Sequence, residues 1–93
     1  MADLVLPLKR EYFEQIRDGE KWFEYRLRNE YWRQRLEGHR PYDRVILTLG
    51  YPKADNESRR IVRPWRGFTN KTITHPHFGP DPVQVYAIDV RPS

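Results

Sequence analysis

The most informative segment of the chain reads Gly19-Glu20-Lys21-Trp22-Phe23-Glu24-Tyr25-Arg26. Its aromatic residues and the turn-forming residues around it predict a strand over residues 21–27. Before it, apolar side chains recur three or four residues apart, which predicts a helix over 8–18. Gly19 follows that helix directly and suits the left-handed conformation that ends many helices. The sequence therefore predicts a helix, a tight glycine turn and a charged strand in immediate succession.

Charged side chains gather on one face of this strand. Because side chains alternate along a strand, Glu24 and Arg26 point to the same face and lie close enough to pair. Trp22 and Arg28 share that face, and the long stem of Lys21 can reach around the end of the strand. Such charges are costly to bury unless they pair with one another or meet a ligand. We therefore expect a functional site here, with a purely structural ion pair as the alternative.

Further short secondary-structure elements are predicted along the rest of the chain. Asn29 can cap a second helix over 30–36. Further strands are predicted over residues 44–49, 59–68, 71–74 and 83–90. Pro64 lacks a backbone donor, which places it on an edge strand or in a bulge.

The order of these elements predicts the fold class. No predicted helix separates the later strands, and a parallel pair needs a long crossover, so we expect antiparallel pairing. The predicted fold is α+β or mainly β: a strongly curved antiparallel sheet or small antiparallel β-barrel flanked by two short N-terminal helices. The chain has 93 residues, the size of one domain, which we expect to span residues 1–93.

Composition narrows the functional classes. Aromatic residues make up 14% of the chain, too many for a disordered segment. There is no cysteine, which excludes disulfides, thiolate catalysis and cysteine-bound metals. No signal peptide or membrane-spanning run is visible, so we expect a cytoplasmic protein without a membrane partner. The net charge of +4 makes this a basic protein and suits an anionic partner such as RNA.

Four positions of the charged strand and its turn form a motif. Gly19, Lys21, Glu24 and Arg26 match the pattern G-x-K-x-x-E-x-R, and the chain resembles the ASCH domains of the PUA-like superfamily. The position of the motif and the order of the predicted elements also fit, so the resemblance covers most of the chain. It implies a small β-barrel with a cleft lined by the motif and a function linked to RNA.

The family includes more than one kind of activity. Some members are suspected RNA-binding modules, and at least one is a ribonuclease. One bacterial branch hydrolyses the acetyl amide of N4-acetylcytidine, with a lysine at the position of Lys21 and a threonine at the position of Glu24. The resemblance implies that Lys21 and Glu24 are the catalytic residues if the chain is an enzyme, although a glutamate here replaces the threonine.

Residue chemistry leaves three roles open for the motif. In a binding site, Lys21 and Arg26 hold a phosphate or carbonyl group while Glu24 accepts from a base amino group. In a ribonuclease, Lys21 or a histidine moves protons and Arg26 stabilises the charged intermediate. In an amidase, a desolvated Lys21 activates water or the substrate.

A second candidate surface is rich in cations. Arg63 and Arg66 flank Trp65, and Lys71 follows with no acidic residue between them. An exposed aromatic residue among cations suits the bases and phosphates of single-stranded RNA. Alternatively, Trp65 belongs to the core and the arginines point outward into solvent.

Other candidates are aromatic. Of Tyr31 and Trp32 on the second helix, we expect one to pack and the other to line the mouth of the cleft. His75 and His77, with Asp81 close by, could bind a metal if a third ligand came from elsewhere, but a general acid or base role is favoured because imidazole titrates near neutral pH. We expect no metal and no cofactor.

The sequence as a whole predicts an ASCH-like domain that binds RNA or a nucleotide-like ligand in a cleft built on Lys21, Glu24 and Arg26. The alternative is a hydrolase: a metal-independent ribonuclease acting on single-stranded RNA, or an amidohydrolase acting on a modified nucleoside. A third interpretation is a module whose basic face contacts an acidic protein. The predicted ligand-binding residues are Trp22, Arg26, Arg28, Arg63, Trp65, Arg66, Lys71 and His75.

Overall fold

The computed structural model describes residues 2–38, 42–52 and 56–92. In chain order, its elements are β1 (Asp3–Leu8), α1 (Arg10–Arg17), β2 (Phe23–Leu27), α2 (Glu30–Leu36), β3 (Arg44–Leu49), the 3-10 turn η1 (Glu57–Arg59), β4 (Arg60–Pro64), β5 (Phe68–Ile73), the 3-10 turn η2 (Pro76–Phe78) and β6 (Val83–Asp89). The fold is α+β and mostly sheet, as the sequence predicts.

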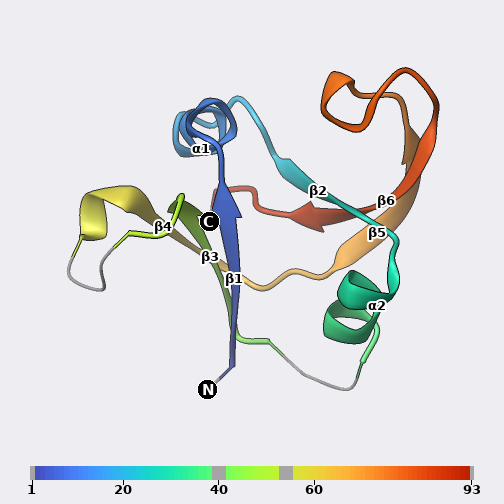
Figure 1. Ribbon diagram of the computed structural model, residues 1–93. Coiled ribbons are helices and arrows are strands. Elements are labelled where there is room, and N and C mark those ends of the chain that lie inside the picture. Colours follow the sequence, from blue (N-terminus) through green and yellow to red (C-terminus); the bar gives the residue numbers. More distant parts are fainter. Residues whose placement is uncertain (1, 39–41, 53–55, 93) are drawn as a thin grey trace.

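The strands form two open three-stranded sheets, with the orders β1-β3-β4 and β2-β6-β5. Figure 1 shows the two sheets side by side, with α1 above and α2 below in this view. The described strands close no barrel, so two sheets stand in place of the barrel that the sequence predicts.

Strand β1 is the main element that sequence reasoning misses. Residues 3–8 pair in parallel with β3, with Asp3 opposite Arg44 and Leu8 opposite Leu49, whereas the sequence predicts only antiparallel pairs. The other three pairings are antiparallel. Helix α1, strand β2 and helix α2 lie between β1 and β3 and supply the crossover that a parallel pair needs. The expected antiparallel pairing therefore holds for the second half of the chain and is wrong for its first strand.

Alternating leucines explain why β1 is a strand. Its inward-facing, buried residues are Leu4, Leu6 and Leu8. Pro7 is tolerated because β1 lies at the edge of its sheet, where a missing backbone donor breaks no ladder. Leu8 therefore belongs to the strand, and the helix predicted from this residue begins only at Arg10.

The arginine-rich segment forms two strands rather than the single strand predicted over 59–68. Strand β4 ends at Pro64 and β5 begins at Phe68. Between them Gly67 has a positive φ of 85°, a conformation that costs glycine little. Here the chain passes from one sheet to the other, and Pro64 ends an edge strand as predicted.

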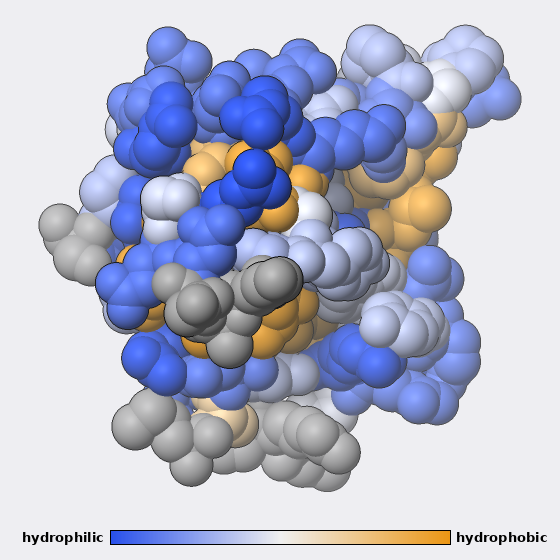
Figure 2. All heavy atoms as spheres, turned by 60° about the vertical axis from the view of Figure 1, so that its left-hand side comes forward, coloured by the Kyte–Doolittle hydropathy of each residue, from blue (hydrophilic) through white to orange (hydrophobic). Residues whose placement is uncertain are grey.

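One hydrophobic core joins both sheets and both helices. Phe13 and Ile16 of α1 and Leu36 of α2 pack with buried residues of β1, β3 and β4. Tyr86 and Ile88 bring β6 into the same cluster. Figure 2, turned to bring the β4 side forward, shows only small apolar areas between hydrophilic side chains on this face.

Two local signals position the charged strand, and both match the sequence predictions. Gly19 has a φ of 81° and ends α1, and the N–H of Lys21 then donates to the carbonyl of Gln15 at 3.1 Å. Asn29 caps α2 by accepting from the N–H of Trp32 at 3.0 Å. Strand β2 is thereby held between the two helix ends.

Candidate ligand-binding cleft

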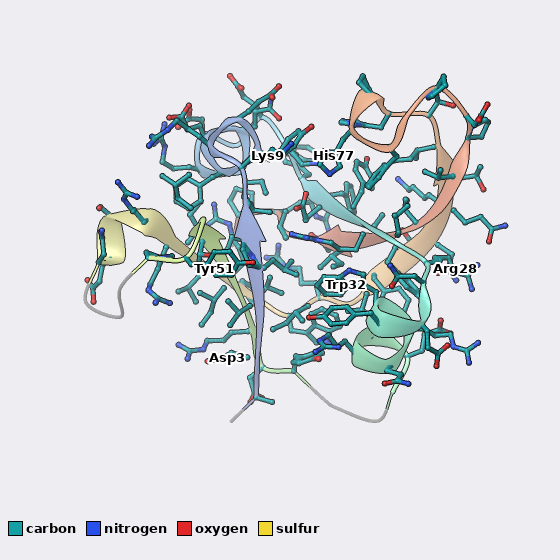
Figure 3. The ribbon with its side chains drawn as sticks, in the orientation of Figure 1. Asp3, Lys9, Arg28, Trp32, Tyr51 and His77 are labelled. Carbon is teal, nitrogen blue, oxygen red and sulfur yellow. The ribbon has the colours of Figure 1, made fainter. Side chains whose placement is uncertain are left out.

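A cavity of about 330 Å³ opens between the end of β1, helix α1, strand β2 and turn η2. Figure 3 shows Lys9 and His77 near one end of it and Trp32 near the other. The residues that line it are Pro7, Leu8, Lys9, Tyr12, Lys21, Glu24, Tyr25, Arg26, Leu27, Asn29, Trp32, His75, His77 and Phe78. The three charged positions of the motif therefore converge on one cavity.

Lys21, Glu24 and Arg26 form an ion-pair network, here called the cleft triad. Lys21 Nζ lies 3.5 Å from Glu24 Oε1, and Arg26 Nη2 lies 3.0 Å from Glu24 Oε2. The three side chains are 14%, 8% and 21% exposed, respectively. The sequence predictions that Glu24 pairs with Arg26 and that Lys21 reaches around the strand end are both confirmed.

Both oxygens of the Glu24 carboxylate are engaged by the protein itself. Oε1 also accepts from the backbone N–H of Tyr25 at 3.3 Å. Arg26 donates through Nη2 to the carbonyl of Pro7 at 3.0 Å, while its buried Nε has no partner among the described residues. The other nitrogens of Arg26 and the ammonium group of Lys21 carry the donors that can face the cavity. The triad therefore offers a ligand hydrogen-bond donors above all.

Aromatic rings surround the two cations. Lys21 Nζ lies 4.5 Å from the ring centre of Tyr25 and 5.5 Å from that of Tyr12, and Arg26 Cζ lies 5.1 Å from that of Trp32. Burial lowers the pKa of Lys21 below that of a free lysine, and the charge of Glu24 offsets only part of this effect. Lys21 therefore loses its proton at a lower pH than an exposed lysine does.

Turn η2 brings both histidines to the rim of the cleft. His75 Nδ1 accepts from the backbone N–H of His77 at 3.1 Å. The ring of Tyr12 lies 5.9 Å from that of His75 and 6.0 Å from that of His77, and Phe78 packs against both histidines. This rim places two imidazole rings and two aromatic rings around the cavity that Lys21 also lines.

Sequence reasoning assigns His75 to the site but misses some of its neighbours. Lys9 and Tyr12 line the same cleft, as does His77, which the sequence favours only as a general acid or base. Trp32 both packs against the core and lines the cleft, whereas Tyr31 is exposed, so the expected division between the two rings is wrong. Tyr12 occupies the apolar stripe of α1, so periodicity alone assigns it to the core. The proximity of η2 to α1 depends on the sheet arrangement, and no local sequence signal reports it.

Two predicted ligand-binding residues of the charged strand lie outside the cleft lining. Trp22 precedes β2, is 54% exposed and donates through Nε1 to the carbonyl of Gly19 at 3.0 Å. Arg28 follows β2 and stacks over the ring of Tyr86, with its Nη1 donating to Gln84. The strand is shorter than predicted, so alternation does not carry these two side chains into the cleft.

Arg63 and Trp65 also lie away from the cleft. Arg63 donates to the carbonyls of Val90 and Ile16, and burial lowers its pKa. Trp65 packs against the core, with its ring 5.2 Å from that of Tyr42. These contacts favour the structural alternative for Trp65 and Arg63.

Arg66 and Lys71 complete the predicted basic surface, at other places on the fold. Arg66 donates to the carbonyls of Arg91 and Pro92. Lys71 lies over the ring of Phe23, 4.8 Å from its centre. The structure thus places Lys21, Glu24, Arg26 and His75 together and leaves the other predicted residues apart from them.

Comparison with known proteins identifies no family for this chain. No family model, curated protein or solved structure matches the chain. In the described part of the chain, no cluster of three or more His, Cys, Asp or Glu side chains could hold a metal ion. Neither described helix has the length and apolar character needed to cross a membrane. The cleft is therefore the feature of the molecule that bears on its function.

Proposed function

We propose that this chain is an ASCH-like domain of the PUA-like superfamily that binds RNA or a nucleotide-like ligand in the cleft. The observation that carries the proposal is the convergence of Lys21, Glu24 and Arg26 on one aromatic-lined cavity. These are the charged positions of the motif on which the resemblance rests.

The chemistry of the cleft suits an anionic, flat ligand. Two cations share a single carboxylate, so the triad keeps a positive balance and spare donors for phosphate or carbonyl oxygens. Tyr12 and Trp32 offer rings against which an unpaired base can stack. A cavity of about 330 Å³ lies at the small end of the range for ligand pockets, which fits one nucleotide rather than a duplex.

A hydrolase using the same cleft is the second candidate, and a specific observation favours it. Burial lowers the pKa of Lys21, and His75 and His77 lie at the rim beside it. A metal-independent ribonuclease needs one group to take a proton from the attacking hydroxyl and another to give one to the leaving oxygen. An amidohydrolase acting on a modified nucleoside would use Lys21 to activate water or substrate.

The test uses fluorescein-labelled uridine monophosphate and single-stranded oligouridylate in buffer containing a chelator. Binding is followed by fluorescence polarisation and cleavage by gel. Lys21→Met keeps the length of the side chain but removes its charge, so we expect affinity to fall about tenfold. Lys71→Met is the matched control, because Lys71 is exposed and lies outside the cleft.

The outcomes separate the candidates. Intact ligand that binds wild type and Lys71→Met alike, and Lys21→Met more weakly, supports the binding function. Chelator-resistant cleavage that disappears only in Lys21→Met identifies a ribonuclease. If neither ligand binds and neither is cleaved, the proposed function fails for nucleotides and RNA.

A further inference from the structure

A second hollow of about 900 Å³ adjoins the cleft, and we call it the flanking groove. The two share Pro7, Arg26 and Trp32 as lining residues, so they lie next to each other. In Figure 3, Trp32 and Tyr51 lie on opposite sides of strand β1, and both line this groove. Arg26 and Trp32 therefore border both hollows, and Tyr51 lines the second.

The floor of the flanking groove is the outer face of the sheet β1-β3-β4. Pro7 pairs with Thr48 and Thr48 with Arg60, so these three residues form one row across the sheet. Val5 of β1 also faces the groove and is 49% exposed. A continuous sheet face makes this floor long enough for an extended chain.

Exposed aromatic rings line the groove. Tyr51 is 92% exposed and Tyr31 is 54% exposed, so neither ring contributes to the core. Arg35 stacks on Tyr31, with Cζ 3.5 Å from the ring centre. Large aromatic rings exposed to solvent beside a binding cleft suit ligands with flat groups that stack on them, such as nucleic-acid bases.

The charge of the groove is positive. Arg26, Arg35 and Arg60 line it, and Asp3, the one acidic side chain among its described lining residues, is held by Arg44 at 2.8 Å. Arg60 Nε is buried and has no hydrogen-bond partner in the described part of the chain. Arg60 therefore contributes to the groove through the outer part of its guanidinium group.

We infer that the flanking groove binds the nucleotides next to the one held in the cleft, so the ligand is single-stranded RNA rather than a free nucleotide. The inference rests on the proposed function. Alternating rings and guanidinium groups match the bases and phosphates of an unpaired strand. Arg60 meets a phosphate and Tyr51 stacks on a base.

The test compares labelled uridine monophosphate with labelled uridylate tetranucleotide on the full chain. Because each stacked base adds to affinity, the tetranucleotide should bind at least about fivefold more tightly. Arg60→Gln and Tyr51→Ala should each reduce this gain severalfold and leave mononucleotide affinity unchanged. Arg59→Gln is the control, because Arg59 is exposed at the end of η1 and does not line the groove.

Each other outcome overturns the inference in a distinct way. Equal affinity for both ligands would leave the cleft as a mononucleotide site and remove the groove from its function. A gain with length that Arg59→Gln reduces as much as Arg60→Gln would reflect general attraction to a basic surface. Tighter binding of a polyglutamate peptide, lost in Arg60→Gln, would assign the groove to an acidic protein. If no nucleotide binds, the proposed function fails together with the inference.

Discussion

The cleft triad has a counterpart on the other face of the same sheet. Asp89 lies between Arg66 and Arg91, at 4.0 Å and 2.8 Å, and the three form what we call the C-terminal triad. In the register of β2 and β6, Glu24 pairs with Ile88, so the neighbouring Asp89 points to the opposite face. Glu24 and Asp89 thus lie in adjacent rows of the sheet, on opposite faces, and each of the two carboxylates pairs with two cations.

The two triads differ in where the remaining hydrogens of the cations go. Arg66 Nη1 donates to the carbonyls of Arg91 and Pro92, and Arg91 donates to Asp89 through Nε and Nη2. The cleft triad instead faces a cavity, and Arg26 Nε has no acceptor within the described chain. A charge cluster thus becomes a candidate site because it faces a cavity, not through its number of charges.

Removing each carboxylate should give the largest difference between the triads. Glu24→Ala leaves Lys21 and Arg26 mostly buried without their anion, so we expect the free energy of unfolding to fall by about 3 kcal/mol. Asp89→Ala releases two more exposed arginines and should cost about 1 kcal/mol. Urea titrations followed by circular dichroism measure both values. Equal losses would mean that the two triads are energetically equivalent.

Acid should weaken the C-terminal triad. Although partial burial acts in the opposite direction, the hydrogen bonds and charge of Arg91 lower the pKa of Asp89. A carboxyl group with a lowered folded-state pKa stabilises the protein above its unfolded value of about 4, and this stabilisation is lost as pH falls through the folded value. The stability difference between wild type and Asp89→Asn should therefore shrink below about pH 4. Urea titrations across a pH series would contradict this if the difference stayed constant.

The lysine should distinguish the cleft triad at alkaline pH. Because burial lowers the pKa of Lys21, its NMR titration midpoint should lie below that of a lysine in a model peptide. The Glu24 charge raises this pKa, so Glu24→Gln should move the midpoint further down. An upward shift in Glu24→Gln would show that the carboxylate does not act on Lys21 as the structure indicates.

The smallest effect is expected at the tryptophan outside the cleft. Trp32→Leu removes the ring over Arg26 and should weaken RNA binding about fivefold. Trp22→Leu removes a ring that is 54% exposed and lies outside the cleft lining, so affinity should change less than about twofold. Polarisation titrations with the same oligouridylate compare the two variants. A larger loss in Trp22→Leu would extend the site beyond the cleft lining.

The parts of this molecule that sequence predicts well depend on near neighbours. Gly19 ends a helix, Asn29 caps one, and the alternation of Glu24 and Arg26 needs only the strand between them. These features involve residues a few positions apart, so their chemistry is visible in the sequence. The ion pair of Glu24 and Arg26 in the cleft triad could accordingly be predicted.

The parts that sequence does not predict depend on distant partners. Pro7 before an apolar stripe resembles a helix start, and only pairing with β3 makes residues 3–8 a strand. Arg63 and Trp65 look like an exposed basic platform, yet contacts with Val90 and Tyr42 decide their place. Such contacts follow from the arrangement of the sheets, which one sequence does not report. The sequence predicts a closed barrel for the same reason, because no local signal reports that the described strands divide into two open sheets.

The pairing of β1 with β3 also sets the order in which the molecule can assemble. Asp3 and Arg44 are 41 residues apart in the chain, and closing such a loop costs entropy before any contact repays it. During synthesis, the leucines of β1 have no partner strand until residues 44–49 have left the ribosome. The carbonyl of Pro7 that holds Arg26, and the floor of the flanking groove, form only then. A newly made chain therefore gains its cleft late, after both helices have already been able to form.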